Sequence, residues 1–181
     1  MNRSKTTKIH TVLRNTILAG AAIVIILTVG AGGQQGLGGL VTMGGFEWLI
    51  GDWVATTDQG GEIHSFYKWD LNKNLIAMGF KMGEFEGCGM IYYEPAEERV
   101  VQIGVDNRGG IAKGYWDADG EKAVARLEYA PPDGEKRRMA SVHSKVDAET
   151  MKVEFYDMDS DGWLSDEPRG TLEYKRQKKQ T

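Results

Sequence analysis

The string Asp157-Met158-Asp159-Ser160-Asp161-Gly162-Trp163-Leu164 holds the densest group of candidate metal ligands in the chain. Acids at the first, third and fifth positions, glycine at the sixth and an aliphatic residue at the eighth are typical of an EF-hand calcium loop. The bidentate glutamate expected at the twelfth position is replaced by Pro168. Two interpretations stay open: calcium bound by Asp157, Asp159 and Asp161, or a strand connection rich in turn-forming aspartates.

Residues suited to nucleophilic or histidine chemistry are few. His64 and His143 are the two histidines beyond the N-terminal segment, and a metal site needs three or four ligands, so we interpret them as ordinary strand residues. Cys88 stands between two glycines with no histidine nearby in sequence, which favours a small buried residue over a nucleophile. No Gly-x-Ser-x-Gly motif occurs. We therefore expect no catalytic residues.

Arg126 is a candidate for binding a ligand carboxylate. It shares one face of a strand-like run with Val124 and Glu128. If that face is interior, Arg126 would meet a bound acid. Pairing with Glu128 or an outward position is favoured instead, because charged side chains avoid unpaired burial.

The segments that must position these residues alternate with a period of two. Turn signals such as Asp119-Gly120 and Asp161-Gly162 separate them. Regular spacing with short turns predicts an antiparallel up-and-down meander that closes into a barrel, with a sandwich as the alternative. The predicted strands are 51–58, 61–70, 74–83, 87–94, 97–106, 110–117, 121–130, 136–146, 150–158 and 169–176.

Alternation in 97–106 separates two kinds of face. Val101, Ile103 and Val105 form an apolar face, opposite a face that carries Gln102 and Asp106. Several other runs are mixed on both faces, which is typical of a barrel with a partly polar interior.

The opening string Phe46-Glu47-Trp48-Leu49-Ile50-Gly51-Asp52-Trp53 resembles the start of a calycin barrel. Lipocalins, fatty-acid-binding proteins and nitrobindin-like proteins begin their first strand with Gly-x-Trp, here Gly51 and Trp53. The resemblance is greatest to uncharacterised bacterial calycin-like domains. It implies that Trp53 closes one barrel end beneath Arg176 or Arg169. Nitrobindin-like proteins bind haem through a histidine near the chain end; no histidine follows His143, so the resemblance does not extend to haem.

The N-terminus differs in composition from the rest of the chain. Its basic residues precede an uncharged apolar run, 16–29, and then small residues. This pattern predicts a secretory signal peptide or, if it stays attached, a helical membrane anchor. We assign 1–33 to this segment, and we expect a periplasmic or extracellular location.

The remaining chain divides by composition. Residues 34–45 are glycine-rich and predict a flexible linker. Residues 46–176 form the all-β barrel domain, and 177–181 a polar tail.

Charge limits the partners. Without residues 1–33 the chain has 18 basic against 26 acidic side chains, a formal charge of −8. Such a surface repels phosphate backbones, so we expect no nucleic-acid partner. Cys88 is the single cysteine, which excludes an internal disulfide.

The function favoured by these features is a non-catalytic binding module for a small apolar ligand. The alternative is a structural or protein-interaction domain with a filled barrel, anchored by its N-terminus. A calcium-dependent or enzymatic role has less support. The candidate ligand-binding residues are Phe66, Met78, Phe80, Met82, Tyr92, Trp116 and Arg126.

Overall fold

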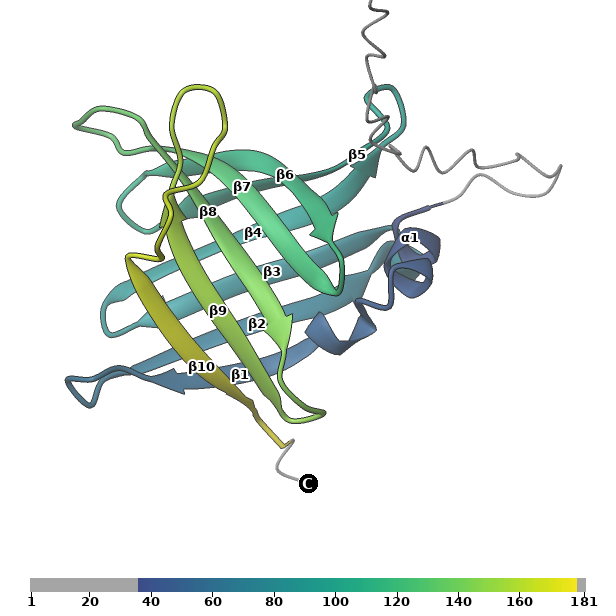
Figure 1. Ribbon diagram of the computed structural model, residues 1–181, viewed down its shortest axis with the longest axis horizontal. Helices are drawn as coiled ribbons and strands as arrows, with labels where there is room; N and C mark the ends of the chain where they lie inside the picture. Colours follow the sequence, from purple (N-terminus) through teal and green to yellow (C-terminus); the bar gives the residue numbers. More distant parts are fainter. Residues whose placement is uncertain (1–35, 179–181) are drawn as a thin grey trace, which may run out of the picture. The chain divides into compact units, whose positions relative to one another are not determined.

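The computed structural model describes residues 36–178, and these form a closed antiparallel β-barrel (Figure 1). The predicted signal or anchor segment, 1–33, and the end of the predicted tail lie outside the described residues. Among the described residues, no helix is long and apolar enough to cross a membrane.

All ten predicted strands are confirmed, with ends that shift by a few residues. The strands are β1 (Gly51–Thr56), β2 (Glu62–Asp70), β3 (Leu75–Met82), β4 (Phe85–Glu94), β5 (Arg99–Asp106), β6 (Ile111–Asp119), β7 (Lys122–Ala130), β8 (Arg137–Lys145), β9 (Thr150–Asp157) and β10 (Gly170–Arg176). The short helical elements are α1 (Leu37–Met43), η1 (Glu47–Leu49) and η2 (Leu71–Lys73).

Each strand pairs with its neighbours in sequence, and β1 pairs with β10 to close the sheet. In that closing pair, Trp53 lies opposite Arg176 and Ala55 lies opposite Tyr174. The predicted barrel is therefore confirmed and the sandwich is excluded. A closed up-and-down barrel of this kind is consistent with a calycin-like fold.

The linker predicted for 34–45 is wrong over most of its length. Residues 37–43 form α1, and Leu37 is almost fully buried in the hydrophobic core with Leu49 and Trp53. Leu37, Leu40 and Val41 have the i, i+3, i+4 spacing of an apolar helix face. The glycine content obscured that spacing.

Glycine in α1 also serves close packing. A Cβ on Gly38 would lie 2.8 Å from Cβ of Lys73 in η2. The helix thus approaches the β2–β3 connection more closely than a larger residue allows. With η1, it covers the barrel end at which β1 begins.

Candidate ligand-binding cavity

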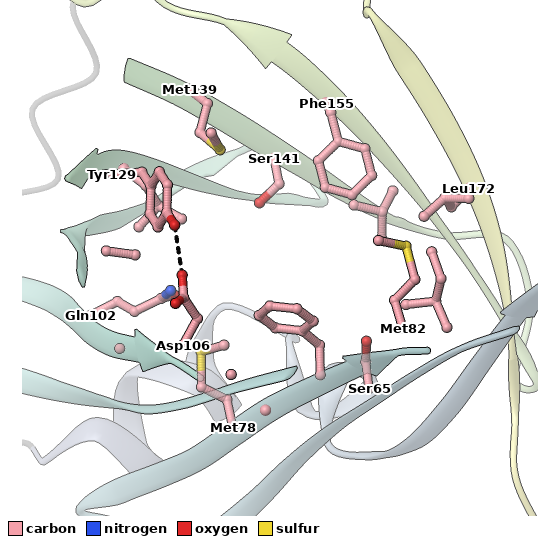
Figure 2. A pocket seen from close by; sticks show the side chains of 18 of the residues that line it. Ser65, Met78, Met82, Gln102, Asp106, Tyr129, Met139, Ser141, Phe155 and Leu172 are labelled. Atoms are coloured by element: carbon pink, nitrogen blue, oxygen red, sulfur yellow. Dashed lines mark hydrogen bonds between the residues drawn. The ribbon is translucent and has the colours of Figure 1, made fainter. Parts of the chain in front are cut away.

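The inward-facing side chains of the barrel enclose a cavity of about 610 Å³. Figure 2 shows Gln102, Asp106 and Met78 on one side of it and Met139, Ser141 and Phe155 on the opposite side. The volume falls within the usual range for small-molecule sites.

The cavity exists because one wall of the barrel has little side-chain volume. The residues of β4, β5 and β6 that line it include Gly87, Gly104 and Ala112. Cross-strand pairing places Gly104 beside Ala112 and also beside Gly89, so small residues are contiguous. A Cβ on Gly89 would collide with the carbonyl oxygen of Ile103, so this position needs glycine for the backbone approach as well.

The rest of the lining is largely apolar and rich in flexible or aromatic side chains. Phe80 and Phe85 stack edge to face with their ring centroids 5.2 Å apart. The apolar lining includes Ile63, Met78, Phe80, Met82, Phe85, Trp116, Leu127, Met139, Met151, Val153, Phe155 and Leu172. Such a lining favours an apolar ligand body.

Polar groups meet at one level of the cavity on β2, β5, β6 and β8. The Tyr67 hydroxyl lies 3.3 Å from Nε2 of His143, and Nε1 of Trp116 donates a 2.8 Å hydrogen bond to Oε1 of Gln102. The Trp116 and His143 rings lie 5.0 Å apart, and Tyr67 meets both rings edge-on. We call Tyr67, Gln102, Trp116 and His143 the polar floor.

The polar floor carries no charge at neutral pH. Burial lowers the pKa of His143 to about 4, although nearby carbonyls of Ala123 and Ser141 act in the opposite direction. Burial likewise raises the pKa of Tyr67, and Tyr174 adds to the effect. His143 Nδ1 is buried without a hydrogen bond of standard geometry. Because Nε2 faces Tyr67, the ring is held in place by that contact.

The opposite end of the cavity has charged groups. Asp106 accepts a 2.7 Å hydrogen bond from the Tyr129 hydroxyl, drawn in Figure 2, and accepts backbone N–H groups of Arg108 and Gly110. These contacts lower the pKa of Asp106 and keep it ionised, and the hydrogen bond from Tyr129 contributes most. Arg169, which also lines the cavity, pairs with Asp157 at 3.2 Å.

The closed end is built around Trp53 and Arg176. The Arg176 guanidinium lies 4.2 Å from the Trp53 ring centroid and donates to the carbonyls of Ile50 and Trp48, each at 2.8 Å. Nε1 of Trp53 donates to Leu49.

Gly51 has φ of +154°, and a Cβ there would collide with Nη1 of Arg176. The Gly-x-Trp spacing therefore has a physical reason: glycine leaves room for the arginine that covers the tryptophan. Arg169, the alternative partner, immediately precedes β10 and pairs with Asp157 instead.

The structure brings together only some of the predicted ligand-binding residues. Met78, Phe80, Met82 and Trp116 line the cavity. Phe66, Tyr92 and Arg126 face outward, because each neighbours an inward-facing residue on a strand of period two. The Phe66 ring contacts the Lys68 ammonium group at 5.0 Å, and Arg126 pairs with Asp117 at 2.8 Å. Assigning Phe66 and Tyr92 to the ligand site was wrong. Arg126 as a carboxylate-binding candidate was also wrong, whereas the outward position that the sequence favoured for it is confirmed.

The aspartate string forms a turn rather than a metal centre. Oδ1 of Asp159 accepts backbone N–H groups of Asp161 and Trp163, each at 2.9 Å, while Asp157 pairs with Arg169. Within 36–178, no three histidine, cysteine or acidic side chains are arranged to hold a metal ion. The turn interpretation therefore agrees with the contacts.

Cys88 is exposed, so the prediction that it is buried was wrong. It lies on the outer face of β4, opposite Val105. His64 is also outside, 3.1 Å from Glu62, whereas His143 is inside on a strand that does not adjoin β2.

Sequence reasoning missed most of the polar floor and the charged end. Tyr67, Gln102, Asp106 and His143 were visible in the sequence, but which strand face is interior was not. The Gly51 and Trp53 motif gave one usable signal, because it implied that Trp53 is interior. Trp53 pairs with Ser65 on β2, so Ser65 and Tyr67, which share one face of that strand, are interior as well.

No protein-family model matches the chain, and no curated protein matches it.

Proposed function

We propose that this protein is an exported, calycin-like binding module that holds a small, largely apolar molecule inside its barrel. The observation that carries the proposal is the cavity of about 610 Å³ with its apolar walls and few polar groups. The opening motif supports the calycin-like assignment, and the composition of residues 1–33 supports export to the periplasm or the exterior, with or without retention of a membrane anchor.

Tryptophan fluorescence tests ligand binding directly, because Trp116 lines the cavity. Titration with medium- and long-chain lipids should change the emission and reach saturation. The Trp116→Phe variant should lose most of this change if the ligand lies in the barrel. A panel without any saturable change would contradict the proposal.

A pair of neighbouring substitutions on β6 supplies a matched control. Ala112 faces the cavity, whereas the next residue, Lys113, is exposed on the outside. Ala112→Phe should fill part of the cavity and weaken binding by at least tenfold. Lys113→Phe should leave the affinity within about twofold. Equal affinities for both variants would show that the ligand binds elsewhere.

A protein-interaction role is the second candidate. Met90, Val105 and Ile111 are 42%, 51% and 39% exposed, and Val105 and Ile111 are cross-strand neighbours. Exposed apolar side chains that adjoin one another favour contact with another surface. If this role is correct, sedimentation of the purified barrel should reveal self-association that Val105→Lys abolishes.

A further inference from the structure

Gln102 presents an oriented pair of hydrogen-bond donors to the cavity. An indole N–H can only donate, so the 2.8 Å bond from Trp116 fixes Oε1 of Gln102 as the acceptor. The amide nitrogen must then point away from Trp116. Gln102 lines the cavity, yet it is only 7% exposed, and within residues 36–178 its amide nitrogen has no hydrogen-bond partner.

This amide nitrogen is therefore a donor that the cavity wall offers, and a ligand oxygen can accept a hydrogen bond from it. The apolar side chains on the walls beside Gln102 are suited to the remainder of such a ligand. Met78 lies on the same side of the cavity as Gln102, and Phe155 lies on the opposite side (Figure 2). A molecule with one acceptor oxygen and a long hydrocarbon part would therefore satisfy both the donor and the walls.

The charges of the cavity act against an anionic ligand. Asp106 is the carboxylate that contributes to the lining, and its hydrogen bonds keep it ionised. Among the described lining residues, Arg169 is the cation, but its guanidinium is paired with Asp157. His143 is neutral. A ligand carboxylate would thus lose its hydration and find no unpaired positive charge.

An amine is disfavoured at the polar floor, whose residues carry no negative charge. Asp106, the carboxylate of the described lining, already accepts three hydrogen bonds, from the Tyr129 hydroxyl and two backbone N–H groups, and these reduce its demand for a further donor. An ammonium group near the polar floor would face the donors of Gln102.

Resting on the proposed function, we propose that the ligand is an uncharged apolar molecule that carries a hydrogen-bond acceptor, such as a long-chain ketone or ester, with its oxygen bound by the amide of Gln102. The cavity therefore discriminates against a fatty acid or amine of the same chain length.

The test compares four probes of matched length on the purified protein at pH 7.5: undecan-2-one, undecanoic acid, undecylamine and undec-1-ene. We expect the ketone to bind at least tenfold more tightly than the acid or the amine, and several-fold more tightly than the alkene. An acid or amine that binds as tightly as the ketone would overturn this inference while leaving the binding module intact. Absence of binding by all four would overturn both.

A substitution then locates the acceptor. Gln102→Met keeps similar volume but removes the amide, so affinity for the ketone should fall about fivefold, the effect of one neutral hydrogen bond. Affinity for undec-1-ene should stay unchanged, which a general loss of structure would not produce. Ser141→Ala, on the opposite wall, is the matched control and should change ketone binding by less than twofold. A larger effect at Ser141 than at Gln102 would contradict the assignment, and the probe comparison decides the question if Gln102→Met does not fold.

Discussion

His143 should make the barrel less stable as the pH falls from 7.5 to 5.0. In the folded state its pKa lies at about 4 because the ring is buried; in the unfolded chain it returns to the ordinary value of 6.5. Between these two values the unfolded state binds a proton and the folded state does not. Protonation therefore favours unfolding, and the stability present above pH 6.5 is lost progressively until the pH reaches about 4.

The size of the effect follows from the two pKa values. The full difference corresponds to about 3 kcal/mol, reached below pH 4. At pH 5.0 the loss relative to pH 7.5 is about 2 kcal/mol. The lowered pKa values of Asp106, Glu128 and Asp147 act mainly at lower pH, because these carboxylates lose their stabilising contacts only when they become protonated. The interval from pH 7.5 to 5.0 therefore isolates the histidine contribution.

Urea unfolding at the two pH values measures this loss. Wild type should lose about 2 kcal/mol, while His143→Gln, which cannot titrate, should lose less than about 0.5 kcal/mol. His143→Gln should be less stable than wild type at both pH values, because the contact with the Tyr67 hydroxyl changes. His64→Gln on the exposed surface is the control and should behave as wild type. A His143→Gln variant that loses as much free energy of unfolding as wild type between the two pH values, with the same dependence on urea concentration, would contradict this prediction.

Two further substitutions test the closed end. Arg176→Lys keeps the charge, but the lysine cannot reach both carbonyls of Trp48 and Ile50. Thermal or urea unfolding should therefore show a loss of stability of about 2 kcal/mol. The control is Lys68→Gln, which breaks the exposed ion pair with Asp52 and should cost less than about 0.5 kcal/mol. Leu37→Ala should lower the free energy of unfolding by about 3 kcal/mol, because the side chain is almost fully buried. Thr42→Ala, on the exposed side of α1, is the control and should lower it little. A negligible effect at Leu37 would restore the linker interpretation.

The strands were predictable because turn chemistry and alternation agree. Short connections such as Asp119-Gly120 fix where a strand must end, and each segment between them has the length of one barrel strand. Closure was predictable for a physical reason as well. Ten consecutive antiparallel strands leave two open edges unless the first and last pair, and an open edge is prone to aggregation.

The interior face of each strand was harder to predict. In β5 the apolar side chains of Val101, Ile103 and Val105 point outward, while Gln102 and Asp106 point into the barrel. Hydrophobicity alone suggests the reverse. The orientation is set by pairing around the barrel: Gln102 lies opposite Ile91, which is almost fully buried. Such pairing is a property of the whole sheet and cannot be derived from one strand.

The distribution of side-chain volume along the barrel connects this fold to binding. A ten-stranded barrel is wider than the eight-stranded barrels whose interior side chains just fill the space. At the closed end, Leu37 and Leu49 from the preceding segments add to Trp53 and fill the extra width. At the level of Gly87 and Gly104 no comparable volume is supplied, and these positions line the cavity. A Cβ on Gly87 would lie 2.7 Å from a ring carbon of Phe80, and one on Gly104 would lie 3.1 Å from the carbonyl oxygen of Cys88, so larger residues do not fit there without a shift of their neighbours. Close packing of the strands thus accounts for the glycines, and the space that they leave near the amide of Gln102 is open to a ligand.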